Sequence, residues 1–181
     1  MSAPATETAG LGVGLVIDDT ISTKTLMDIL ERKISNPEEF LPVTDVVCRP
    51  SDDGVGNCRS TCLLWAYEKI TITSETSLIF ANTYITGIYR EMTFGAKILK
   101  ENIYFDLPNL EVRFVNCDGS AEVVNSVLTD ELGVRRLEFF ARDTNSKEKK
   151  EWPVPKQVAL HGIQKCLDAA RSIDQAKVLP V

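Results

Sequence analysis

Arg90 is a charged residue in a predicted strand, where a side chain that faces the interior could take part in binding or catalysis. In the stretch YREMTF, alternate positions place Arg90 with Met92 and Phe94, the period of a half-buried strand. If that face is interior, the guanidinium must pair with a carboxylate or meet an anionic ligand, because an unpaired buried charge is costly. Glu101 and Glu122 are possible partners on neighbouring strands. The alternative, which we favour because strand parity can slip near a turn, is an edge or exterior Arg90 in a cross-strand ion pair.

The chain has a single histidine, His161, a residue type that can act as a general base near neutral pH. Helical spacing groups His161 with Gln157, Lys165 and Asp168, on the side opposite the apolar stripe of that segment. We therefore expect a surface histidine and not a catalytic base.

Five cysteines, at positions 48, 58, 62, 117 and 166, form an odd and scattered set. This pattern favours a reduced, cytoplasmic compartment over a disulfide framework. Cys58 and Cys62 are four residues apart, but the chain offers only one distant histidine and no second cysteine pair, so free thiols are expected. The sequence also lacks G-x-S-x-G, Walker and dinucleotide-binding motifs. We therefore predict no metal and no cofactor.

The element that must position Arg90 is a meander of three strands within Ile85–Asp118, with turns at Gly95 and at Leu107-Pro108-Asn109. A long amphipathic helix, Lys156–Ser172, is predicted near the C-terminus, with a buried stripe at helical spacing. That stripe consists of Ala159, Ile163, Cys166, Leu167 and Ala170.

The remaining elements complete a single domain at 11–175, after a disordered tail at 1–10. Ser22 or Thr23 is expected to cap a helix, and Asn36 a short second one that starts at Pro37. Residues 55–84 are harder to interpret, because they could form a helix and a strand or a disordered insertion. The other predicted segments are a strand at Val13–Asp18, a helix at Thr25–Ile34, strands at Val43–Arg49, Ala121–Thr129 and Arg135–Arg142, and a charged loop at Asp143–Trp152.

Composition excludes several classes of protein. The 181 residues are 44% hydrophobic and 25% charged, as in an ordinary globular domain. The net charge of −6 and the sequence pI near 4.9 argue against nucleic-acid binding, which needs clustered Lys and Arg. The N-terminus lacks the pattern of a signal peptide, and no apolar run is long enough to span a membrane. These features predict a cytoplasmic protein without an integral membrane segment.

Three segments carry a family resemblance: NPEEFLPV at 36–43, YREMTFG at 89–95 and ILKENIYFDLPNLEVRFVN at 98–116. They resemble the AtaL-like domain-of-unknown-function family, within the SRPBCC (START-like, Bet v 1-like) superfamily. The resemblance covers about 13–50 and 85–173. It implies an α+β helix-grip fold, in which a curved antiparallel sheet wraps a long C-terminal helix and leaves a ligand cavity. The sequence departs from that plan by an insertion at about 55–84.

The resemblance implies a protein that binds a small hydrophobic or amphipathic molecule, such as a lipid, a polyketide-like or an isoprenoid compound. A polyketide cyclase-like enzyme is the alternative, with Arg90, Glu101 and Tyr104 as candidate catalytic residues. A third possibility is an interaction module that docks through the apolar run at 63–67. Monomer and homodimer both remain open. The expected ligand-binding residues are Arg90, Met92, Phe94, Tyr104, Phe114, Phe139, Ile163 and Cys166.

Overall fold

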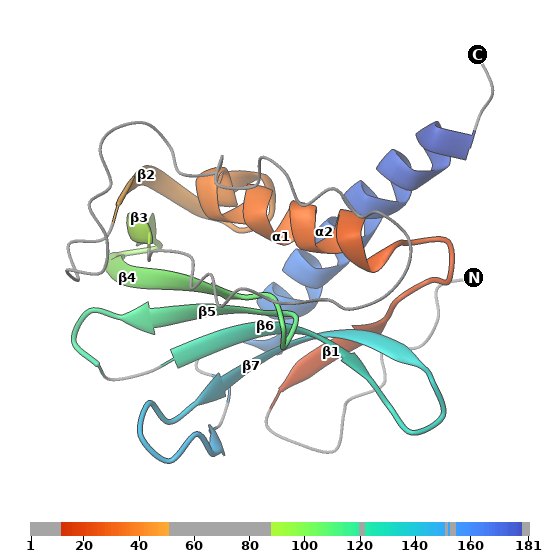
Figure 1. The fold of residues 1–181 in the computed structure, drawn as a ribbon. Helices are drawn as coiled ribbons and strands as arrows, with labels where there is room; N and C mark the ends of the chain where they lie inside the picture. Colours follow the sequence, from red (N-terminus) through yellow and green to blue (C-terminus); the bar gives the residue numbers. More distant parts are fainter. Residues whose placement is uncertain (1–11, 51–87, 120–121, 151, 153–154, 179–181) are drawn as a thin grey trace.

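The protein has an α+β fold, and its described residues form an antiparallel sheet combined with two α-helices (Figure 1). The computed structural model describes residues 12–50, 88–119, 122–150, 152 and 155–178. The predicted tail at 1–10, the whole of the predicted insertion at 55–84, and therefore Cys58 and Cys62, lie outside these residues. The elements are β1 Val13–Val16, α1 Thr23–Ser35, η1 Pro37–Glu39, β2 Val43–Pro50, β3 Ile88–Phe94, β4 Lys97–Asp106, β5 Glu111–Asn116, β6 Glu122–Thr129, β7 Arg135–Arg142, β8 Lys149–Lys150 and α2 Lys156–Val178.

The strands of the sheet follow the order β1-β7-β6-β5-β4-β3-β2, and β8 pairs with β7. Strands β3 to β7 form a meander in which each strand pairs antiparallel with the next. The predicted three-strand meander is therefore confirmed as β3, β4 and β5. The first strand, β1, pairs with β7, which brings the start of the described chain beside the last long strand of the sheet.

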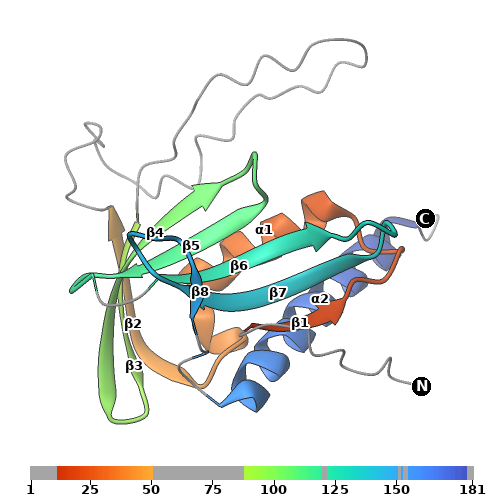
Figure 2. The ribbon, with the colours of Figure 1, turned by 90° about the horizontal axis from the view of Figure 1, so that it is seen from below.

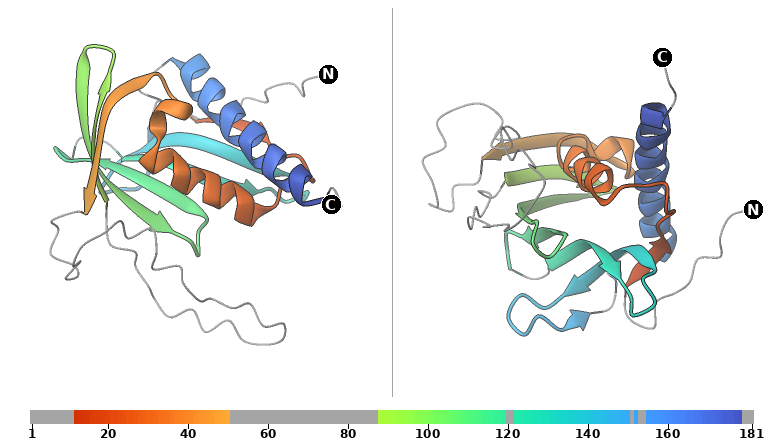
Figure 3. Two further views of the ribbon diagram at one scale, coloured as in Figure 1. Left: turned by 90° about the horizontal axis from the view of Figure 1, so that it is seen from above. Right: turned by 45° about the vertical axis from the view of Figure 1, so that its right-hand side comes forward.

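Both helices cover the same face of the sheet. Seen from below, β6 and β7 lie in front of α1 and α2 (Figure 2), and seen from above the two helices lie over the strands (Figure 3). Each strand presents alternate side chains to that inner face, among them Ile103 of β4, Phe114 of β5 and Phe139 of β7. This arrangement of an antiparallel sheet and a C-terminal helix is consistent with a helix-grip fold.

Helix α1 begins at a serine cap. The Ser22 side-chain oxygen accepts a hydrogen bond from the Thr25 backbone amide at 3.1 Å, which satisfies one of the free amides of the first turn. Thr23, the alternative cap, is the first helical residue instead. Leu26 and Leu30 lie on the buried stripe of the helix and have no exposed surface.

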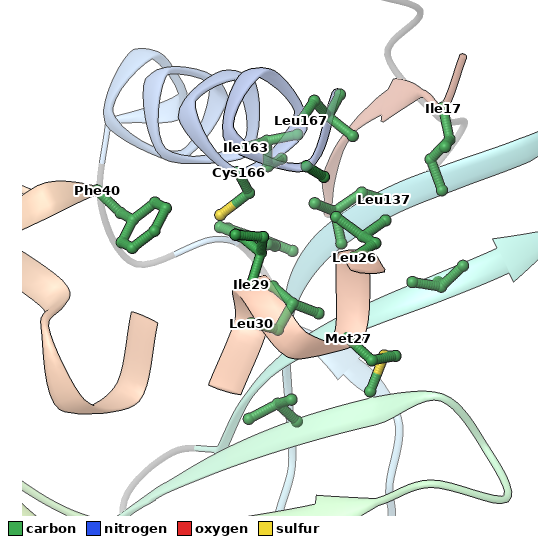
Figure 4. Close-up of a cluster of buried hydrophobic side chains, with 14 of the residues drawn as sticks. Ile17, Leu26, Met27, Ile29, Leu30, Phe40, Leu137, Ile163, Cys166 and Leu167 are labelled. Atoms are coloured by element: carbon green, nitrogen blue, oxygen red, sulfur yellow. The ribbon is translucent and has the colours of Figure 1, made fainter. Parts of the chain in front are cut away.

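Helix α2 confirms the stripe that the sequence predicts, because all five predicted residues are buried. His161 lies on the exposed side, as expected. The helix continues past the predicted end at Ser172 to Val178. Side chains of α1, α2, β1 and β7 meet in one hydrophobic core, with Cys166 and Ile163 above Ile29 and Leu30 (Figure 4).

Two predicted boundaries near strands are wrong. The segment Asp143–Trp152 is not entirely loop, since Lys149 and Lys150 pair with Arg142 and Ala141 as the short strand β8. The first strand ends at Val16 and not at Asp18, because Asp18 turns the chain by accepting hydrogen bonds from the amide and hydroxyl of Thr20.

Candidate functional site

Arg90 lies inside the molecule and pairs with Glu101, directly opposite on β4. Its Nη2 lies 2.7 Å and its Nε 3.2 Å from Glu101 Oε2, and the Arg90 side chain is only 2% exposed. Nη1 donates to the backbone carbonyls of Lys33 and Ile34, both at 3.3 Å, near the end of α1. The expectation of an edge or exterior Arg90 is therefore wrong, but the expected cross-strand ion pair is present, with Glu101 as the partner.

Glu122, the other possible partner, belongs to the opposite face of the sheet. Its carboxylate accepts hydrogen bonds from Arg142 Nη2 at 2.9 Å and Lys147 Nζ at 3.1 Å, and Arg113 Nη1 lies 3.6 Å away. Although burial raises its pKa, the hydrogen bonds from Arg142 and Lys147 hold the pKa of the Glu122 carboxyl below its usual value. Glu122 therefore anchors the outer face and takes no part in an interior site.

Lys33 is an interior cation that the sequence analysis missed. Its side chain is 3% exposed, and Nζ lies 4.0 Å from the centroid of the Phe139 ring and 5.5 Å from that of Phe114. Among the described residues, no oxygen accepts a hydrogen bond from Nζ, and none forms an ion pair with it. Burial lowers the pKa of the Lys33 amine to about 8. The ring faces attract the ammonium without supplying a counter-charge.

Asn125 brings a second polar group to the same face. It stands on β6 between Val123 and Val127, which both pack into the core, and it is 1% exposed. Neither its amide nitrogen nor its amide oxygen has a hydrogen-bond partner in the described part of the chain. Asn125 lies directly across from Phe139 on β7, so its Cβ is about 5 Å from that of the residue whose ring meets Lys33.

Cys166 reaches the interior from α2 and has no exposed surface. Burial raises the pKa of its thiol to about 11, and the nearby charge of Lys33 offsets only part of that rise. The thiol therefore stays protonated at neutral pH and is a poor nucleophile. Cys48 on β2 and Cys117 in the turn after β5 are exposed.

The three residues proposed for catalysis do not form one site. Arg90 and Glu101 face inward, whereas Tyr104 alternates with Ile103 and Phe105, which pack into the core. Tyr104 is therefore on the outer face, where the guanidinium carbon of Arg113 lies 5.4 Å from the centroid of its ring. Tyr104, which is also a predicted ligand-binding residue, therefore does not lie on the inner face with Phe114 and Phe139.

Most of the other expected ligand-binding residues are interior. Met92, Phe114, Phe139, Ile163 and Cys166 are all buried, with at most 4% exposure. Phe94 is half-buried at the end of β3. Within the described ranges, no group of three or more His, Cys, Asp or Glu side chains could hold a metal ion.

Lys33 and Asn125 each occupy a position in the sequence that marks them as interior polar residues. Lys33 follows Leu26, Ile29 and Leu30 at helical spacing, so it occupies a position of the buried stripe. Asn125 interrupts the alternation of Val123 and Val127 along an interior strand face. A polar residue at an apolar position of a periodic pattern is the mark that both share.

No family model matches the chain, and no curated protein does. A solved structure, the crystal structure of TTHA0849 from Thermus thermophilus, is 11% identical in sequence. The match covers 93% of this chain and 99% of that one, with a TM-score of 0.43. Among the described helices, none is long and apolar enough to cross a membrane.

Proposed function

We propose that this protein is an SRPBCC-type, helix-grip protein that binds a small amphipathic molecule between the inner face of its sheet and its helices. The observation that carries the proposal is the unpartnered carboxamide of Asn125 on the inner face. A buried polar group without a partner costs about 1–3 kcal/mol, so such groups point to a missing partner. A ligand with one polar end would supply that partner.

The surroundings of Asn125 suit the rest of such a ligand. The inner face beside it carries Val112, Phe114, Val127 and Phe139, all buried and apolar. Ligand sites in proteins usually combine an apolar lining with a few polar groups that fix orientation. Lipid, polyketide-like and isoprenoid molecules all match this description.

Binding is favoured over a cyclase reaction by the state of the interior polar groups. The Arg90 guanidinium already donates to Glu101 and to two carbonyls of α1, so it is not available to polarise a substrate carbonyl. The Cys166 thiol is protonated at neutral pH, and Tyr104 is on the other face. The interaction hypothesis concerns residues 63–67, which lie outside the described residues.

Displacement of Nile red, a neutral fluorescent probe, together with native mass spectrometry of gently purified protein, tests the proposal. We expect the wild type to bind the probe or to retain a copurified molecule. Asn125→Leu should weaken probe displacement by a long-chain alcohol about tenfold, which corresponds to about 1.4 kcal/mol.

Ser126→Ala is the matched control. Ser126 is the next residue on β6, is also buried without a hydrogen-bond partner for its hydroxyl, and faces the outer side. Its substitution should leave binding unchanged. A wild-type protein that neither binds the probe nor retains any small molecule would overturn the proposed function.

A further inference from the structure

The charges on the inner face do not balance. Three charged side chains of the described residues are buried there: Lys33, Arg90 and Glu101. Arg90 and Glu101 neutralise each other through hydrogen bonds of 2.7 and 3.2 Å to one carboxylate oxygen. Within the described ranges, Lys33 is left with two aromatic rings and no anion. The described part of the interior therefore holds one cation more than it holds anions whenever Lys33 is protonated.

A buried ammonium without an anion is an unfavourable arrangement unless something else pairs with it. The Phe139 ring, 4.0 Å from Nζ, fixes the place of the ammonium and leaves its hydrogen-bond donors without an acceptor. The unpartnered Asn125 amide lies across from that same phenylalanine. Two independent polar groups without partners thus adjoin one ring.

We propose that the polar end of the bound molecule is a carboxylate, which pairs with Lys33 Nζ over the Phe139 ring and accepts a hydrogen bond from the Asn125 amide. This inference rests on the proposed function and names the ligand class that the site would take. A carboxylate carries one negative charge and two acceptor oxygens, which match one ammonium and one amide donor. A phosphate dianion would leave a net negative charge beside Glu101.

The direct test compares two ligands of equal chain length, dodecanoic acid and dodecanol, by displacement of Nile red at pH 7. We expect the wild type to bind the acid at least about tenfold more tightly than the alcohol. Lys33→Met should abolish this preference by weakening only the acid, because methionine keeps the apolar stem and removes the charge. Lys33→Gln, which keeps a polar end, is a second variant with the same expectation.

Lys24→Met is the matched control on the same helix. Lys24 Nζ pairs with Asp28 at 2.8 Å on the surface, with its side chain 77% exposed. Its substitution removes the same charge from the protein and should leave both affinities unchanged. Any long-range effect of net charge on the binding of an anion would appear equally in this control.

The outcomes separate this inference from the proposed function. Equal affinities for acid and alcohol in the wild type, or a preference that survives both Lys33 substitutions, would overturn the carboxylate assignment and leave amphipathic binding in place. Failure of both ligands to displace the probe, with no small molecule retained, would overturn both proposals. Loss of acid binding alone in the two Lys33 variants would support the assignment.

The pH dependence gives a second readout. The charged and titratable groups around Lys33 are Cys166 from α2, Arg90 from β3 and Glu101 from β4. Because the pKa of the free Lys33 amine is about 8, the ammonium is lost as the pH rises through that value, whereas Cys166, with a pKa of about 11, remains protonated. The affinity for dodecanoic acid should fall above about pH 8, and that for dodecanol should not.

Discussion

Arg90 and Glu101 join three elements through a few polar atoms. The guanidinium of Arg90 is shared between the β4 carboxylate and the last turn of α1, where it meets carbonyls that the helix itself leaves without partners. Because both side chains are buried, removal of either one leaves the charge of the other buried without a partner. This pair therefore holds the end of α1 against the sheet at β3.

Glu101→Gln tests the strength of this pair. We expect a loss of about 3 kcal/mol in the free energy of unfolding, because the Arg90 charge stays buried while its counter-charge is removed. Urea unfolding followed by circular dichroism measures it. Glu91→Gln is the control, since Glu91 contacts Lys100 at 3.4 Å and has a side chain 36% exposed. That change should cost less than about 1 kcal/mol.

The double variant Arg90→Met/Glu101→Leu separates two free energies: the cost of one unpaired buried charge and the net contribution of the ion pair to stability. Two apolar residues of similar size should lose less stability than Glu101→Gln alone, because no charge is left buried. If Glu101→Gln proves no more destabilising than Glu91→Gln, the buried pair is not formed in solution.

At the scale of residues, the sequence predicted which side chains could pair but not where they lie. Strand parity correctly grouped Arg90 with Met92, yet it could not decide which face was inner, since a slip of one residue exchanges the faces. The burial of Lys33 was not predicted because lysine is rarely buried, and a lysine in a helix is normally expected to be exposed to solvent. Its burial depends on rings that β5 and β7 bring from positions distant in the chain.

At the scale of elements, α2 packs its apolar stripe against the hydrophobic core. Ile163 has no exposed surface and contributes to the same cluster as Leu26 and Leu137, whereas His161 lies on the exposed side of the helix. Two residues apart in sequence, these side chains point in opposite directions around the helix. They provide a sensitive test of the helix orientation.

Ile163→Asp should destabilise the protein by about 4 kcal/mol or more, since it removes a packed side chain and buries a carboxylate without a partner. His161→Ala should cost less than about 0.5 kcal/mol, as an exposed substitution does. Thermal melts of both variants provide the measurement. If His161→Ala is the more destabilising change, the face of α2 that carries Ile163 is not the buried one.

Elements with strong periodicity could be predicted, and elements that depend on distant partners could not. The stripe of α2 and the bounds of β7 follow from local pattern, because helix and strand periods are visible in a single segment. Strand β8 has only two residues, both lysine, and its existence depends on an edge that β7 leaves open. The Glu138 carboxylate accepts from Lys149 and helps to hold it there.

At the scale of the whole molecule, Asp174 ties the two helices together. Its carboxylate near the end of α2 accepts hydrogen bonds from the Ser22 backbone amide at 2.8 Å and from the Thr25 hydroxyl at 2.6 Å, both at the start of α1. Lys177 Nζ lies 2.8 Å from the same carboxylate. A negative group at a helix N-terminus is favoured by the helix dipole, so this contact suits the ionised form.

The pH dependence of stability tests this contact between Asp174 and the start of α1. Hydrogen bonds from Lys177, Thr25 and Ser22 hold the pKa of the Asp174 carboxyl below its usual range. An unfolded aspartate has a pKa of about 3.9, so the ionised contact stabilises the fold above that pH and is lost as the pH falls through the lower, folded value. We expect Asp174→Asn to melt at a lower temperature than the wild type at pH 7, with the difference shrinking below about pH 4.

Comparison of variant and wild type at each pH isolates Asp174 from the other carboxylates, because Asp18, Glu122 and Asp143 also have lowered pKa values and are present in both proteins. Asp168→Asn is the control on the same helix, because the Asp168 side chain is 55% exposed and pairs with Arg171. That variant should follow the wild-type melting temperature within about a degree, as expected of a surface pair. A difference between Asp174→Asn and wild type that stays constant from pH 7 to below pH 3 would exclude an ionised tie between the helices, and the junction of α1 with α2 would then depend on apolar packing alone.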